Sequence, residues 1–339
     1  MEVKLEHVPA EMPTFADAPR CERLEDLDAD VAIIGIPYKS PYEVSVPLDS
    51  VDTAVQPAVV VQSAATMRSA ATMRSAAVAL RKQSMVYAHS LRHYDFDFAG
   101  DLFAGRDVRI ADCGDLALEA GKYEEQLQSI TQAIRKILER GAVPIVLGGD
   151  HGTPSPILRA YQNHGPLCVV QIDAHLDFRD EREGFKDGFS SQMRRAAEMP
   201  WVESMAQIGL RGVGSGRQEE YEAALEYGSV MVRAQELHQL GVDGILERIP
   251  EAAKYYITID SDGLDPSIAP GVYYPSPGGV GYFEMTDLVK GIARRGAIAG
   301  IDFCEVVPVL DVRDLTSIFA SRLILNFIGS MAHSGQIGG

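Results

Sequence analysis

Short apolar runs bounded by turn residues recur along the chain, and longer amphipathic stretches separate them. This alternation predicts β-strands and α-helices that build a mostly parallel sheet covered by helices on both faces. The apolar runs predict strands at residues 31–36, 108–111, 143–147, 167–172, 204–208, 230–232, 255–259 and 297–301. Apolar residues at helical spacing predict helices at residues 122–140, 283–295 and 315–331.

The organisation of the chain favours one large domain. No linker rich in Pro, Gly or Ser divides the 339 residues, and a hydrophobic content of 46% is enough for a sizeable core. We therefore predict a single three-layer α/β domain over residues 1–339. Residues 63–77 carry the unit SAATMR twice and begin it a third time, and their Ala, Met and Arg content favours helix. A duplicated stretch of surface helix is the main interpretation, and an interaction surface is the alternative.

Charge and cysteine content limit the possible partners and compartment. The formal net charge of -17 argues against binding of nucleic acid or of an anionic membrane surface, and it suits a small cationic substrate. The four cysteines form no C-x-x-C pattern, and the chain shows neither a signal-peptide layout nor a run of 18 apolar residues. We expect a cytoplasmic protein that contacts no membrane.

Three clusters of acidic residues and histidines follow predicted strands. They are GGDHG at residues 148–152, DAHLD at 173–177 and DSDGLDP at 260–266. Because the carboxyl ends of parallel strands lie at one edge of a sheet, where open α/β sheets bind ligands, we expect the three clusters to lie at one site. Any one of them alone is as typical of a capping or turn segment as of a ligand set.

The residue types in the clusters indicate a metal centre. Asp173, His175 and Asp177 are spaced two apart, so in extended chain their side chains project to one side and converge. Asp260 and Asp262 repeat this spacing on another strand. Four gathered carboxylates repel one another unless cations compensate them, and two divalent ions balance four Asp charges. The six candidate ligands are His151, Asp173, His175, Asp177, Asp260 and Asp262. Oxygen-rich sets of this kind suit Mn²⁺ and accept Ni²⁺.

These segments resemble the signatures of the ureohydrolase (arginase/agmatinase) family. The resemblance extends over roughly 300 residues, from DVAIIGIP at residue 30 to GIDFCEVVP, and it is poor at residues 38–84. It implies an arginase-like fold in which His151, Asp173, Asp177 and Asp260 bind one ion. The second ion would be bound by His175 and Asp262 together with Asp173 and Asp260, which would bridge the two. The implied reaction is attack of a metal-activated hydroxide on a guanidino carbon, which releases urea and an amine.

Some positions bear on the substrate. Glu305 matches the family glutamate that pairs with the guanidinium of the substrate. Asp187 stands where the family usually places a proton-shuttling histidine, so we expect Asp187 either to shuttle protons or to bind a cationic group of the substrate. Tyr273, Tyr274 and Ser276 replace the usual residues at the entrance and are expected to contact the substrate.

These departures favour an N-substituted guanidine or a biguanide over arginine, as in metformin and dimethylguanidine hydrolases, which favour nickel. An agmatinase or guanidinobutyrase is the alternative. Two further hypotheses are a deacetylase with a single zinc ion and a non-catalytic subunit of a mixed oligomer. The resemblance implies a trimer or hexamer, possibly with a homologous second subunit. All six ligand positions are intact, which favours an active subunit.

Overall fold

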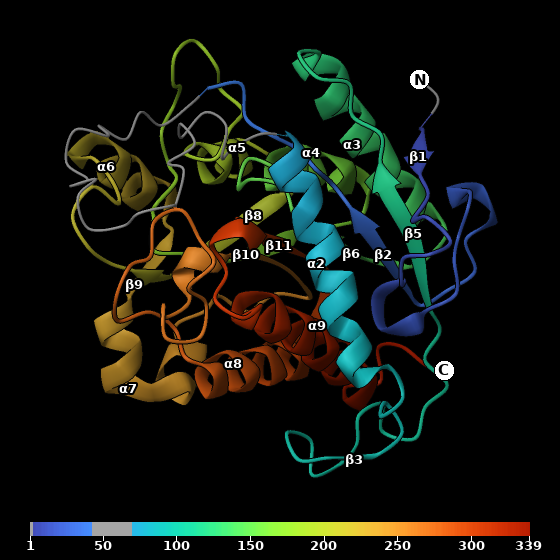
Figure 1. The fold of residues 1–339 in the computed structure, drawn as a ribbon. Helices are drawn as coiled ribbons and strands as arrows, with labels where there is room; N and C mark the ends of the chain where they lie inside the picture. Colours follow the sequence, from blue (N-terminus) through green and yellow to red (C-terminus); the bar gives the residue numbers. More distant parts are fainter. Residues whose placement is uncertain (1–2, 43–69) are drawn as a thin grey trace, which may run out of the picture.

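The computed structural model describes residues 3–42 and 70–339 (Figure 1). Within these residues nine strands form one sheet, in the order β1-β5-β2-β6-β11-β10-β7-β8-β9. Every neighbouring pair is parallel except β1 and β5. The strands are β1 (Leu5–Glu6), β2 (Val31–Gly35), β5 (Ile110–Leu116), β6 (Val143–Leu147), β7 (Leu167–Ile172), β8 (Val202–Leu210), β9 (Val230–Arg233), β10 (Lys254–Asp260) and β11 (Ala297–Cys304). A separate hairpin pairs β3 (Tyr94–Asp95) with β4 (Gly100–Asp101).

Helices cover both faces of the sheet. One apolar core lies between the sheet and α2, α7, α8 and α9, and a second lies between the sheet and α3, α4, α5 and α6. The helices are α2 (Ala70–Ala88), α3 (Tyr123–Glu139), α4 (Pro154–Arg159), α5 (Gln192–Ala197), α6 (Gln218–Tyr227), α7 (Ala234–Leu246), α8 (Tyr282–Arg295) and α9 (Leu315–His333). The predicted fold class is confirmed: the protein is a single α/β domain of three layers with a mostly parallel central sheet.

The central strands are apolar on both faces because both faces are covered. In β6, Ile145 and Leu147 join the core beneath α2 and α9, whereas Val146 joins the opposite core. Successive side chains of a strand point to opposite faces, so a buried parallel strand appears as a continuous apolar run. The predicted strands at residues 143–147 and 167–172 have the observed bounds of β6 and β7, and the predicted helices 122–140, 283–295 and 315–331 correspond to α3, α8 and α9.

Strand β5 differs most from its prediction, because it runs to Leu116 where residues 108–111 were expected. Asp112 and Asp115 lie inside it, and such residues usually mark a strand end. Arg81 of α2 compensates both: its Nε lies 2.9 Å from Asp112 Oδ2 and its Nη1 lies 2.6 Å from Asp115 Oδ1. Burial alone would lower the pKa of the Arg81 guanidinium, but the two carboxylates raise it above its usual value.

We expect Arg81→Met to lower the free energy of unfolding by about 3 kcal/mol, because it leaves two buried carboxylates without a counter-charge. Chemical denaturation measures the change. Arg109→Met is the control, since Arg109 is half exposed and pairs at the surface with Asp28 and Asp30. Equal unfolding midpoints for Arg81→Met and the unsubstituted protein would contradict the proposed role of the buried guanidinium.

The repeated segment lies only partly within the described residues. Residues 63–69 are outside them, and residues 70–77 form the start of α2. The predicted helix is therefore present where it can be observed. The helix does not lie at the surface as expected. Met73, Ala76 and Ala77 are buried, and α2 packs against α9.

Helix α9 is the one helix of the described chain that is long and apolar enough to cross a membrane, with a mean hydropathy of 1.4. It is also 83% buried within the protein. Phe319, Leu323 and Phe327 belong to the core between α9 and the sheet. Its apolar composition is explained by this packing.

Candidate metal centre

The predicted ligands lie at the carboxyl ends of three strands, and the predicted substrate-binding residue Glu305 follows a fourth strand beside them. His151 follows β6, Asp173 follows β7, Asp260 ends β10 and Glu305 follows β11. These strands neighbour one another in the order β6-β11-β10-β7. Parallel strands end at the same edge, so segments far apart in the sequence meet there.

Three carboxylates surround the Nδ1 atom of His151. The Oδ2 atom of Asp173 lies 2.9 Å from it, and the Oδ2 atoms of Asp177 and Asp260 each lie 3.3 Å from it. All four side chains are buried. Donor atoms of His151, Asp173 and Asp260 lie within 4.8 Å of one another, which makes them a possible ligand set for one ion.

A second set shares Asp173 with the first. The Nδ1 atom of His175 lies 3.4 Å from Asp173 Oδ1 and 3.2 Å from Asp262 Oδ2. Asp173 therefore turns one oxygen to each set. Asp260 turns its Oδ2 atom to His151, and its Oδ1 atom accepts a hydrogen bond from the backbone N–H of Asp262 at 2.8 Å.

The loop 173–177 departs from the extended chain that its spacing predicted. Bends occur at Ala174 and His175, and the backbone of Asp177 has a φ of 50°. As a result the three side chains do not converge on one point: Asp177 faces His151, whereas His175 faces Asp262. Glu305 also has a positive φ, of 59°. Such strained non-glycine residues gather at functional sites, where the surrounding structure holds them.

The charges at this site favour added positive charge. Burial, followed by the neighbouring charge of Asp173, raises the pKa of Asp177 to about 7, and burial together with Asp262 raises the pKa of Asp260 well above its usual value. Burial alone would lower the pKa of His175, but hydrogen bonds to Asp173 and Asp262 raise it to about 12. Neighbouring positive charge stabilises crowded, buried carboxylates of this kind.

The donor set fits two divalent ions. Four carboxylates and two imidazoles meet at two points that share Asp173, and neither set contains a thiolate. Oxygen-rich sets with few nitrogen ligands suit Mn²⁺ and related divalent ions rather than structural zinc. The chemistry of these side chains therefore agrees with the predicted pair of ions.

A buried polar chain orients His151. Its Nε2 atom lies 2.9 Å from Thr258 Oγ1, and Thr258 donates to Asp302 Oδ1 at 2.8 Å. Because the single hydroxyl proton of Thr258 goes to Asp302, its oxygen accepts the Nε2–H of His151. The lone pair of Nδ1 is then directed at the candidate ligand set, as required of a metal-binding imidazole.

We expect Thr258→Val to weaken metal binding by about 10- to 100-fold, the range for loss of a partner that orients a ligand. Titration of chelator-treated protein with Mn²⁺ measures the affinity. Thr286→Val is the matched control, since Thr286 is also buried but donates to Phe283 in α8. Unchanged affinity in Thr258→Val would show that the polar chain does not hold His151.

A cavity of about 240 Å³ opens onto the candidate ligands. Its floor includes His175, Asp177, Asp260, Asp262 and Glu305. The other lining residues are Arg179, Arg182, Phe189, Ser190, Gly214, Ser215, Glu220 and Tyr274. A pocket of this kind, apolar on some walls and acidic at its end, suits a small organic cation.

Two of the residues predicted at the entrance are not among those that line this cavity. Tyr274 lines it, whereas Tyr273 and Ser276 do not. The carbonyl of Ser276 accepts a hydrogen bond from Arg211 Nη2 at 2.7 Å. Substrate contact by Tyr273 and Ser276 therefore stays a prediction.

Asp187 also lies elsewhere. Its Oδ1 atom accepts hydrogen bonds from Ser155 Oγ at 2.5 Å and from Arg159 Nη2 at 2.6 Å. It lines a separate cavity with Tyr38 and Lys122. The carboxylate of Asp187 is thus bound to two residues of α4, and its role as a proton shuttle or as a substrate contact stays a prediction.

Sequence reasoning missed the residues that occupy the position expected of Asp187. Phe189 and Ser190 line the cavity, and Tyr42 fixes them there: the Ser190 N–H donates to the Tyr42 hydroxyl at 3.2 Å. Gly188 lies so close to this ring that a Cβ would be 2.2 Å from its hydroxyl. The partners are 148 residues apart, so no local spacing marks them.

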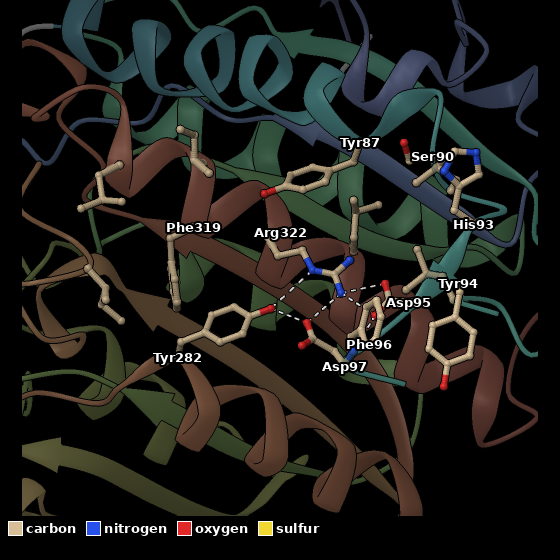
Figure 2. Close-up of a pocket in the computed structure, with 16 residues that line it drawn as sticks. Tyr87, Ser90, His93, Tyr94, Asp95, Phe96, Asp97, Tyr282, Phe319 and Arg322 are labelled. Atoms are coloured by element: carbon tan, nitrogen blue, oxygen red, sulfur yellow. Dashed lines mark hydrogen bonds and ion pairs between the residues drawn. The ribbon is translucent and has the colours of Figure 1, made fainter. Parts of the chain in front are cut away.

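A larger cavity, of about 680 Å³, lies beside the hairpin of β3 and β4, between α2 and α9 (Figure 2). Arg322 points into it between Asp95 and Asp97, with an Nη2–Oδ2 distance of 2.7 Å to each. The Tyr282 hydroxyl donates to Asp97. None of the candidate ligands lines this cavity, so we assign it no part in the metal centre.

Comparison with known proteins agrees with this geometry. The model of the Arginase family matches residues 58–329. An agmatinase of Bacillus subtilis is 34% identical over 222 residues, which cover 64% of this chain and 74% of that protein. A guanidinobutyrase of Pseudomonas aeruginosa is 31% identical over 227 residues, which cover 65% of this chain and 70% of that protein.

Solved structures share the fold. Proclavaminate amidino hydrolase from Streptomyces clavuligerus superposes with a TM-score of 0.76 at 24% identity, over 96% of this chain and 98% of that one. The agmatine ureohydrolase of Thermoplasma volcanium gives a TM-score of 0.70 at 24% identity, over 95% of each chain. With the family model matching most of its length, the chain belongs to the arginase family, whose members are amidinohydrolases that cleave non-peptide C–N bonds of linear amidines.

Proposed function

We propose that this protein hydrolyses a guanidino C–N bond of a small N-substituted guanidine, which releases urea and an amine, or of a biguanide, which releases an amine and leaves a guanylurea. The observation that carries the proposal is the sharing of Asp173 by two ligand sets at the end of a pocket that also contains Glu305. His151, Asp173, Asp177 and Asp260 would hold one divalent ion, and His175 and Asp262 would hold the other together with Asp173 and Asp260.

Each group in the site has a distinct task. Two divalent ions held by these ligands would supply a hydroxide nucleophile near neutral pH and would stabilise the charge that develops in the transition state. Glu305 receives the guanidinium, a planar cation whose N–H groups match the two oxygens of a carboxylate. The Glu305 carboxylate is oriented by the backbone N–H of His151, which donates to its Oε1 atom at 3.2 Å.

The walls of the pocket support a compact, partly apolar substrate. Phe189 and Tyr274 line the cavity, and aromatic faces attract delocalised cations such as alkylated guanidines. The volume of about 240 Å³ leaves room for a short substituent. This combination supports an N-alkylguanidine or biguanide substrate.

A guanidino acid is the second candidate. Arg182 lines the same cavity and stacks on the rings of Tyr42, at 5.0 Å, and Phe189, at 5.6 Å. A guanidinium at this wall attracts a carboxylate at the far end of a substrate and disfavours a second cationic group such as that of agmatine. The similarity to a guanidinobutyrase also supports this candidate.

Release of urea, or of guanylurea in the case of metformin, measured over a panel of substrates separates these candidates. The protein, loaded separately with Mn²⁺ and Ni²⁺, is incubated with 1,1-dimethylguanidine, metformin, 4-guanidinobutyrate, agmatine and arginine. We expect the highest kcat/KM with an alkylguanidine or biguanide and with Ni²⁺. Preference for 4-guanidinobutyrate would favour the second candidate, and preference for agmatine or arginine would overturn the proposed specificity.

Two measurements exclude the remaining hypotheses. A deacetylase with a single zinc ion would bind one metal ion per chain, whereas two are expected here. A non-catalytic subunit would release no urea when purified alone, whereas an active subunit would. Size-exclusion chromatography with light scattering tests the proposed trimer or hexamer and shows whether a second subunit is required.

A further inference from the structure

The side chain of Gln192 contacts residues of the first ligand set, although no pattern in the sequence marks Gln192 as a ligand. It is the first residue of α5, and its side chain is fully buried. Its Nε2 atom lies 2.9 Å from His151 Nδ1 and 2.5 Å from Asp177 Oδ2. The same Nδ1 atom lies 2.9 Å from Asp173 Oδ2 and 3.3 Å from Asp177 Oδ2, so the amide group lies beside the proposed position of the first ion.

The opposite end of this amide is unsatisfied. Within the described residues, Gln192 Oε1 is buried without a hydrogen-bond partner. A buried polar atom left in this state is unusual and destabilises the folded protein. In the present orientation the amide nitrogen therefore contacts His151 Nδ1 and Asp177 Oδ2. The amide oxygen, which is the better metal donor, faces away from these two atoms.

An ion bound by the first set would favour the opposite orientation of the Gln192 amide, with its oxygen toward the ligands. The polar chain through Thr258 directs the Nδ1 lone pair of His151 at the set, where the Gln192 amide N–H group now points. A cation at that point repels an N–H group and attracts an amide oxygen. The two ends of an amide are nearly equal in size, so a half-turn about its terminal bond exchanges them without repacking. The half-turn breaks no hydrogen bond of Oε1, because that atom has none to lose.

We propose that Gln192 Oε1 is a fifth protein ligand of the first ion, beside His151, Asp173, Asp177 and Asp260. The inference rests on the proposed two-ion site and deepens it. Amide oxygens are hard donors that suit Mn²⁺ and related ions. The second set retains fewer protein ligands, and its His175 is 30% exposed toward the cavity. The first ion is thereby the tightly bound one, and the second keeps open positions for water and substrate.

Titration of chelator-treated protein with Co²⁺, followed by visible absorption and by calorimetry, tests this inference independently of catalysis. In Gln192→Leu we expect the first equivalent of Co²⁺ to bind at least about tenfold more weakly. Its absorption should also strengthen, because cobalt with fewer ligands absorbs more strongly. Gln192→Glu, which keeps an oxygen donor and adds charge, should bind the first equivalent at least as tightly as the unsubstituted protein. Gln126→Leu, at a buried glutamine of α3 far from the ligands, should change neither readout.

The possible outcomes distinguish failure of the two-ion site from failure of Gln192 as a fifth ligand. If the unsubstituted protein binds fewer than two equivalents of Co²⁺, the two-ion function fails and the role of Gln192 fails with it. If it binds two equivalents and Gln192→Leu keeps the first-site affinity and spectrum, the fifth ligand alone is refuted. Should Gln192→Leu not fold, weakened first-site binding in Gln192→Glu, with two ions in the unsubstituted protein, would also refute it.

Discussion

Asp173→Asn is expected to lower urea formation on the order of 10³-fold, the scale seen when a preorganised electrostatic group is removed from a buried site. Asp173 is the one residue common to both candidate ligand sets, with Oδ2 at 2.9 Å from His151 Nδ1 and Oδ1 at 3.4 Å from His175 Nδ1. The substitution removes the charge that both ions share and keeps the size of the side chain. Metal analysis should show a loss of both ions, whereas substitution of a residue belonging to one set should empty that set first.

Asp187→Asn is the matched control for this experiment. It makes the same chemical change at a carboxylate that binds Ser155 and Arg159 outside the ligand sets. We expect it to keep two ions per chain and most of the activity. Retention of two ions and full activity by Asp173→Asn would contradict the shared ligand. Loss of both ions in Asp187→Asn would contradict our placement of that residue.

Glu305→Gln is expected to lower kcat/KM by about 30- to 4000-fold, equivalent to about 2 to 5 kcal/mol, while two ions per chain remain bound. The substitution keeps the size of the side chain and an oxygen that accepts the His151 N–H, but it removes the charge that pairs with a guanidinium. Steady-state urea assays, combined with metal analysis of the same preparation, measure both quantities.

Glu220→Gln provides the comparison within the same pocket. Glu220 also lines the cavity, but its carboxylate already pairs with Arg179 at 2.9 Å. We expect it to change kcat/KM by less than about tenfold, since partly exposed ion pairs contribute little. Equal effects of the two substitutions would show that Glu305 has no special contact with the substrate, and loss of ions in Glu305→Gln would point to a structural role.

Local sequence patterns were sufficient to predict the bounds of the strands β6 and β7, which are buried on both faces. Residues 143–147 and 167–172 are continuous apolar runs and form β6 and β7 with those bounds. Strand β5 was predicted too short because Asp112 and Asp115 look like turn residues. Their charge is compensated by Arg81, 31 and 34 residues earlier in the chain, and sequence periodicity carries no information about such a partner.

The sequence alone determined the chemistry of the candidate ligands. Acidic residues and histidines directly after apolar runs are placed at strand ends by the geometry of a parallel sheet, whatever the order of the strands. Only the tertiary structure decided how they are grouped. The insertion of β11 and β10 between β6 and β7 brings Asp260 beside His151, and a bend after Asp173 sends His175 to Asp262.

The same distinction explains Asp187 and Gln192. Both residues lie in the segment after Asp177, and local spacing predicted Asp187 as the site residue. In the structure Asp187 binds Arg159 of α4, and the amide of Gln192 lies beside His151. The path of this loop depends on contacts with Tyr42 and Ser155, which come from distant parts of the chain. Spacing along a strand is local and can be predicted from the sequence, whereas strand order and loop contacts depend on long-range packing that no short motif encodes.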